Sequence, residues 1–115
     1  MKNKNYIKFL SKLHPDKLED QKIKAHNYYA KKRGDDNVIT LNEWKELKAK
    51  FNYTCLRCHQ REPSIILTLD HVVPVSKGGV NIITNIQPLC GPCNYIKGRK
   101  ATDYRQEFEA WASST

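Results

Sequence analysis

Four cysteines, arranged as two Cys-x-x-Cys pairs, constrain this 115-residue chain more than any other feature of its sequence. Cys55 and Cys58 form the first pair and Cys90 and Cys93 the second, with 31 residues between the pairs. Each pair can place two thiolates around one tetrahedral centre, and together the pairs use every cysteine of the chain. The spacing therefore predicts a structural Zn²⁺ site that joins two segments distant in the sequence.

Two other uses of these cysteines are open at this stage. They could form two disulfides, or the run from Cys55 to His59 could attach haem, because it matches the pattern C-x-x-C-H. Lysines at positions 2, 4, 8 and 12 interrupt any apolar secretory signal, and no run of about 18 apolar residues could cross a membrane. We therefore expect a cytoplasmic chain with reduced thiols and no membrane partner, which favours zinc. Haem attachment would also leave Cys90 and Cys93 without a function. We assign no functional role to His59.

The charge of the chain is concentrated at its N-terminus. The net charge is +8, of which residues 1–33 carry +7 and residues 34–115 only +1. A basic arm on a nearly neutral body suits a polyanionic partner, and nucleic acid is the first candidate. A solvated, solubilising helix would show the same charge run. We expect residues 1–35 to form a basic helical arm and residues 36–115 a single domain, whose small core would gain folding free energy from a metal.

Hydrophobic periodicity and helix caps predict an α+β fold. Asp16 is the expected N-cap of the first helix, with Glu19 as its capping partner, and Gly91-Pro92 is expected to begin a later one. The expected helices cover about 16–33, 41–51 (after a Thr40–Glu43 capping box), 91–100 and 102–112, and the expected strands cover 65–75 and 85–89. The aromatic and aliphatic side chains at helical spacing are assigned to the core, namely Leu41, Trp44, Leu47, Phe51, Tyr104, Phe108 and Trp111.

The dipeptide Asp70-His71 lies between the two cysteine pairs, near the end of the first expected strand. A carboxylate beside an imidazole suits metal-assisted hydrolysis of a phosphodiester. The same dipeptide could also be a hydrogen-bonded pair at the end of a strand, with no catalytic role. Because adjacent residues on a regular strand point to opposite faces, we expect the backbone to depart from regular strand geometry at this pair.

Further motifs follow in a fixed order along residues 52–100, namely Leu69-Asp70-His71-Val72-Val73-Pro74, Lys77-Gly78-Gly79, Asn85-Ile86-Gln87-Pro88-Leu89-Cys90, Cys93-Asn94 and Lys97-Gly98. In these residues the chain resembles the HNH endonuclease family, in its zinc-stapled ββα-metal branch. The resemblance implies a ββα-metal core with a four-cysteine zinc, flanked by N-terminal helices and a C-terminal helix. Residues 36–115 would then be the nuclease domain.

The resemblance also implies roles for single residues. His71 matches the general base and Asn85 the residue that holds the catalytic loop and orients His71. Asp70 and Asn94 match the ligands of a catalytic divalent ion, and Gly98, four residues after Asn94, cannot add another. One carboxylate and one amide oxygen favour Mg²⁺ or Mn²⁺. Zinc held by the cysteines would clamp the helix that carries Asn94 against the strand that carries Asp70.

The expected function is a metal-dependent DNA endonuclease that uses a single divalent ion and leaves 5′-phosphate ends. Lys97, Arg99 and Lys100 are expected to contact DNA phosphates. The alternatives are a non-catalytic zinc-ribbon module that binds DNA with a degenerate nuclease site, and an RNA-binding or structural protein that uses zinc only to fold. The sequence indicates no protein partner and leaves monomer and dimer, and any sequence preference, open.

Overall fold

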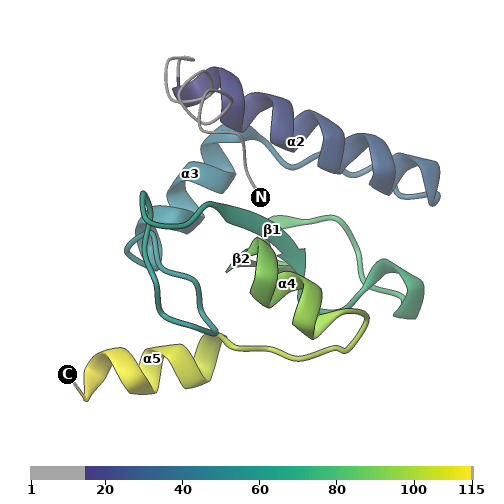
Figure 1. Ribbon diagram of the computed structural model, residues 1–115. Helices are drawn as coiled ribbons and strands as arrows, with labels where there is room; N and C mark the ends of the chain where they lie inside the picture. Colours follow the sequence, from purple (N-terminus) through teal and green to yellow (C-terminus); the bar gives the residue numbers. More distant parts are fainter. Residues whose placement is uncertain (1–14, 115) are drawn as a thin grey trace.

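The fold combines helices with a two-stranded sheet in a computed structural model that describes residues 15–114 (Figure 1). This confirms the expected α+β class. Residues 1–14 of the expected basic arm lie outside the described residues. The elements run in the order α2 (Pro15–Lys32), α3 (Leu41–Lys50), β1 (Leu67–His71), β2 (Ile86–Cys90), α4 (Gly91–Lys97) and α5 (Arg105–Ser113), with short 3-10 turns at Val75–Lys77 (η1) and Ile83–Asn85 (η2).

The first two described helices lie close to their expected positions. Helix α3 begins after Thr40, whose hydroxyl accepts from the Glu43 amide while the Glu43 carboxylate accepts from the Thr40 amide, so the capping box is confirmed. Helix α2 begins at Pro15, so Asp16 lies in its first turn and the expected N-cap was wrong. Glu19 does not act as a capping partner either, because its carboxylate accepts from Trp44 Nε1 at 2.9 Å.

Helix α2 is docked on the body of the molecule. Glu19 forms a 2.6 Å ion pair with the buried Lys48, and Ile23 packs into the core. Asn27 Nδ2 donates to the Ile39 carbonyl, while Asn27 Oδ1 accepts from the Ile39 amide. The C-terminal part of the expected arm is therefore an integral part of the fold, with fixed contacts to the chain that follows it.

Strands β1 and β2 form an antiparallel pair whose register runs from Leu67–Cys90 at one end to His71–Ile86 at the other. The first strand is shorter than expected. The Val72 amide still donates to the Asn85 carbonyl, but the Val73 amide donates to the Asn85 side chain instead, and the chain turns away. The expected departure from strand geometry at Asp70-His71 was also wrong, since both residues stay in register. The two side chains lie on opposite faces of β1, as a regular strand requires.

Helix α4 follows β2 directly and contacts both strands. Cys90 is its N-cap and Pro92 its second residue, one position away from the expected Gly91 cap. The helix ends at Lys97, earlier than expected, because Gly98 turns the chain at φ 58°. Helix α4 therefore begins at one end of the hairpin and reaches the other, so that a short helix connects the two ends of the sheet.

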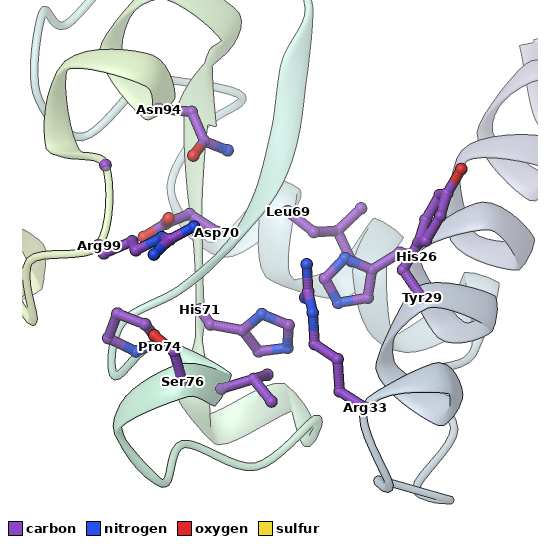
Figure 2. Close-up of a pocket in the computed structure, with 12 residues that line it drawn as sticks. His26, Tyr29, Arg33, Leu69, Asp70, His71, Pro74, Ser76, Asn94 and Arg99 are labelled. Atoms are coloured by element: carbon purple, nitrogen blue, oxygen red, sulfur yellow. The ribbon is translucent and has the colours of Figure 1, made fainter.

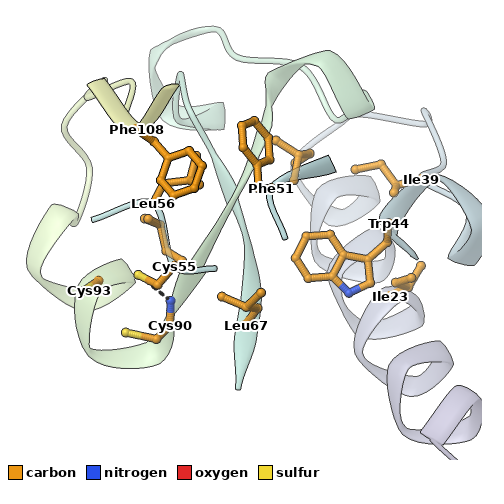
Figure 3. Packing of buried hydrophobic residues seen from close by; sticks show 12 residues of the cluster. Ile23, Ile39, Trp44, Phe51, Cys55, Leu56, Leu67, Cys90, Cys93 and Phe108 are labelled. Atoms are coloured by element: carbon orange, nitrogen blue, oxygen red, sulfur yellow. Dashed lines mark hydrogen bonds between the residues drawn. The ribbon is translucent and has the colours of Figure 1, made fainter. Parts of the chain in front are cut away.

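The core lies between α2, α3, the sheet and α5 (Figure 3). Trp44, Phe51 and Phe108 are buried as expected and Tyr104 is partly buried. Trp111 was expected in the core but is 40% exposed, and its ring stacks on His59 with 3.9 Å between centroids. Among residues 15–114, none of the helices has the length and apolar character needed to span a membrane.

Candidate functional site

The four cysteines meet at one end of the hairpin. Their Sγ atoms all lie within 4.8 Å of one another, and Cys58 Sγ is 3.8 Å from Cys90 Sγ. All four are free thiols. Tetrahedral zinc with bonds of about 2.3 Å places its sulfurs about 3.8 Å apart, so the donor set fits a Zn²⁺ ion. One centre shared by four sulfurs also accounts for the spacing better than two separate disulfides.

Local backbone geometry brings the two cysteine pairs together. The first pair lies in a short loop closed by the bridge between Thr54 and Arg61. The amide of Cys90, at the junction of β2 and α4, donates to Cys55 Sγ at 3.3 Å. Burial, together with the neighbouring thiols, raises the pKa of Cys90 to about 12, so a thiolate at this position needs a nearby cation to offset its charge.

The other end of the hairpin opens into a cavity of about 520 Å³ (Figure 2). Helix α2 forms one wall, and β1, α4 and the segment after β1 form the rest. The sequence-predicted residues Asp70, His71, Asn94 and Arg99 all line this cavity, whereas Asn85 does not. The remaining lining residues are His26, Tyr29, Arg33, Leu69, Pro74, Val75, Ser76 and Gly98.

Asp70 lies on the side of β1 that faces α4. Its Oδ2 accepts from Gln87 Nε2 at 3.0 Å and lies 3.2 Å from Lys97 Nζ. Burial raises the pKa of the Asp70 carboxyl, outweighing the opposite effects of Gln87 and Lys97. Asn94 reaches the same wall from α4, where its Nδ2 donates to Thr68 Oγ1 at 2.9 Å. The side-chain oxygen of Asn94 is then the atom that could coordinate a cation next to Asp70.

His71 lies on the opposite side of β1, facing α2 (Figure 2). Its ring stacks on the ring of His26, with centroids 4.6 Å apart and an interplanar angle of 26°. Nε2 of His71 lies 3.0 Å from Asn81 Oδ1, and Nε2 of His26 lies 2.8 Å from the same oxygen. Burial first, and then the charge of His71, lower the pKa of His26 to about 4.

Asn85 supports the loop that follows β1. Its Oδ1 accepts from the Val73 amide, and its Nδ2 donates to the carbonyls of Val73 and Val80, each at 3.0 Å. Gly79 packs so closely here that a Cβ would stand 1.7 Å from the Val73 carbonyl oxygen, which excludes any larger residue. Asn85 was expected both to hold the loop and to orient His71. Its hydrogen bonds are consistent with the first role, whereas the side chain that hydrogen-bonds to the His71 ring is Asn81.

The three expected phosphate contacts differ in exposure. The side chain of Lys97 is 0% exposed, and its ammonium group binds Asp70 and the His71 carbonyl. Lys97 is therefore a structural residue, and the expectation that it contacts DNA was wrong. Arg99 and Lys100 are exposed, and Arg99 lies at the cavity.

Sequence reasoning missed the α2 wall and Asn81. His26, Tyr29 and Arg33 recur at helical spacing on one face, and this is the signal that marks a shared surface. Asn81 sits in a loop after two glycines, where an asparagine is usually read as a turn former.

Comparison with known proteins gives one family. Residues 53–107 match the family described as HNH endonuclease. This agrees with the resemblance found from the motifs and indicates a nuclease or DNA-binding function. A search of curated proteins and a search of solved structures each found no match.

Proposed function

Since residues 53–107 match the HNH endonuclease family, we propose that this chain is a metal-dependent DNA endonuclease with a ββα-metal core formed by β1, β2 and α4. One observation supports the proposal most strongly: Asp70, His71 and Asn94 come from two elements and line a single cavity. A module that only binds DNA has no need of an imidazole and a carboxylate in the same cavity.

His71 is the proposed general base, which takes a proton from the attacking water. Imidazole is the side chain best suited to exchange protons near neutral pH. The ring is held by Asn81 and by stacking on His26, and a base held in this way loses little freedom when substrate binds. Asn85 keeps the loop next to His71 in place through its three hydrogen bonds.

Asp70 and Asn94 are the proposed ligands of a divalent ion. Their oxygen donors suit Mg²⁺ or Mn²⁺, and the bound ion would supply positive charge to the scissile phosphate and the leaving oxygen. Lys97 already binds one oxygen of the Asp70 carboxylate, which partly offsets its charge and favours an exchangeable ion over a tightly held one.

Basic residues border the cavity on two sides. Arg99 comes from the segment after α4 and Arg33 from the residue directly after α2, and Lys100 lies exposed beside Arg99. We assign these three residues to the DNA backbone on either side of the cleaved bond, which would end as a 5′-phosphate. The zinc centre would act at a distance, by fixing the start of the helix that carries Asn94.

The test is cleavage of supercoiled plasmid by zinc-loaded protein with Mg²⁺ or Mn²⁺, beside His71→Ala and an EDTA control. We expect the wild type to cut, EDTA to stop it, and His71→Ala to lower the rate by about 10²- to 10⁴-fold, the usual contribution of a general base. Folded, zinc-loaded wild type that binds DNA but cuts with no divalent ion would instead support the non-catalytic zinc-ribbon module.

A further inference from the structure

Helix α2 lies outside the segment that matches the family, yet it places a second imidazole against the proposed base. His26 and His71 are 45 positions apart in the sequence and share one hydrogen-bond acceptor, Asn81 Oδ1. Asn81 is fully buried, so the orientation of its amide is set by its protein partners alone.

Those partners fix which atom of the Asn81 amide faces the histidines. Asn27 is oriented by Ile39, whose amide donates to Asn27 Oδ1 and whose carbonyl accepts from Asn27 Nδ2. Asn81 Nδ2 donates to that same Asn27 oxygen at 2.9 Å and to the Asn37 carbonyl at 2.9 Å. Both amide hydrogens of Asn81 are thereby used, and its oxygen is the atom left for the two rings.

A carbonyl oxygen only accepts hydrogen bonds, so each imidazole must donate to it from a protonated Nε2. In a neutral ring, protonated Nε2 means that Nδ1 carries the lone pair. His71 Nδ1 is then the nitrogen that can receive a proton from water. The tautomer of the base thus follows from a chain of contacts that begins at the backbone of Ile39.

We propose that His26 is a positioning residue for His71, holding the shared Asn81 oxygen in place and covering one face of the ring, so that Nδ1 of His71 stays available as the base. This inference rests on the proposed nuclease function. Two contacts carry it, namely the 2.8 Å hydrogen bond to Asn81 and the 4.6 Å ring stacking. Each restricts a different motion, since the bond fixes the acceptor and the stack fixes the plane of the ring.

The surroundings of His26 favour this role. The groups that face its ring are His71 on β1, Asn81 in the loop and the Arg33 guanidinium just after α2. Burial and the charge of His71 both disfavour an imidazolium at position 26. A neutral ring stacks on His71 without charge repulsion. Asp35 also holds Asn81, because its carboxylate accepts from the backbone N–H of Asn81 at 2.6 Å.

Two measurements test the proposal. The first is single-turnover cleavage of plasmid by wild type, His26→Ala, His26→Gln and the exposed α2 control Gln21→Ala. We expect His26→Ala to lower the rate at saturating DNA by about 10- to 100-fold, the scale of a misplaced catalytic group, with little change in the DNA concentration at half-maximal rate. His26→Gln keeps an N–H in reach of Asn81 and should recover part of the rate, while Gln21→Ala should match wild type.

The second measurement needs no activity. Long-range proton–nitrogen NMR correlations of the imidazole rings in ¹⁵N-labelled, zinc-loaded wild type report which ring nitrogen carries the proton, and His71→Ala and His26→Gln assign the signals. We expect both rings to be protonated at Nε2 near neutral pH. His71 protonated at Nδ1, or a folded His26→Ala that cuts at the wild-type rate, overturns the proposal.

The two readouts also separate the failure of this proposal from the failure of the nuclease function. If the wild type cuts no DNA but both rings are protonated at Nε2, the proposed nuclease function is wrong and the inferred geometry of the two rings still holds. If the wild type and the folded His26→Ala variant cut equally well and His71→Ala does not cut, the nuclease function holds and His26 has no part in it. If His26→Ala fails to fold, His26→Gln and the wild-type spectrum still decide.

Discussion

The two ends of the β1–β2 hairpin are constructed in different ways. At the end where Leu67 pairs with Cys90, the four cysteines come from two short segments, the loop that holds Cys55 and Cys58 and the junction of β2 with α4. At the end where His71 pairs with Ile86, the cavity draws its walls from β1, α4 and a helix that begins at residue 15. The metal end is therefore encoded by spacing, and the cavity end depends on how distant elements dock.

Helix α4 connects these two ends and is held at both. Its first turn contains Cys93 of the metal cluster, and its last residue, Lys97, pairs with Asp70 under the cavity. Asn94 lies between them. Zinc bound by the cysteines would fix one end of the helix that carries the proposed ion ligand, and the ion pair fixes the other.

The largest effect is expected at the metal end. Cys93→Ser removes one of four ligands, and since structural zinc contributes about 10 to 16 kcal/mol of apparent binding energy in small zinc domains, we expect the protein to lose zinc, ordered structure and cleavage together. Zinc content and circular dichroism measured on the same sample check this. A Cys93→Ser protein that lost zinc but kept full cleavage would show that the cavity end stands without the metal.

This difference between the ends also explains what could be predicted from the sequence. The cysteine spacing led to a cluster that fits zinc, and the Thr40–Glu43 pair led to a capping box, because both signals lie within a few residues. The strand ends were predicted less accurately, because the Asn85 side chain accepts from the Val73 amide and β1 ends there, whereas the hydrophobic pattern continues further along the chain.

The tertiary contacts of the cavity could not be found in this way. Lys97 lies within three residues of the exposed Arg99 and Lys100, so the local sequence does not distinguish it from them. It is buried because it packs against Asp70 in the folded protein. His26 lies in a basic helix that reads as a solvated arm, and its pairing with Asn81 spans 55 positions. Contacts at such separations arise from packing, which a local pattern does not encode.

The next effect in size concerns the ion pair at the cavity end. Lys97→Met leaves Asp70 buried without its cation, and we expect a loss of about 3 kcal/mol in the free energy of unfolding, the usual result of breaking a buried pair on one side. Chemical denaturation with zinc present measures it. The double variant Lys97→Met with Asp70→Asn should recover part of this loss, and equal stability of wild type and Lys97→Met would mean that α4 is held by zinc alone.

A smaller effect is expected from pH, through His26. Its folded-state pKa of about 4 lies below the value of about 6.5 for a free histidine, so between these values the unfolded chain binds the extra proton and stability falls as the pH is lowered. We expect a loss on the order of 2 kcal/mol from pH 7 to pH 4.5, discounted for the partial exposure of the ring. His26→Gln is the control. It keeps the four cysteines, so any loss of stability that comes from protonation of the zinc ligands at low pH occurs in both proteins, and the difference between them reports on His26. Parallel stability profiles for the two proteins would contradict the assignment.

The smallest effect tests whether the α2 wall meets the substrate. Each phosphate neutralised by a side chain contributes about 0.9 to the slope of log K against log salt for duplex DNA, so Arg33→Ala should reduce that slope by about 1 in a His71→Ala background that binds without cutting. Lys24→Ala removes the same charge from α2 itself, at an exposed position outside the cavity, where Lys24 pairs with Asp20. Equal slopes for the two variants would mean that α2 contributes only a diffuse positive field. A change confined to Arg33→Ala would show that the helix outside the family segment is part of the DNA-binding cleft, and that the cavity end, unlike the metal end, is completed by residues that the family pattern does not contain.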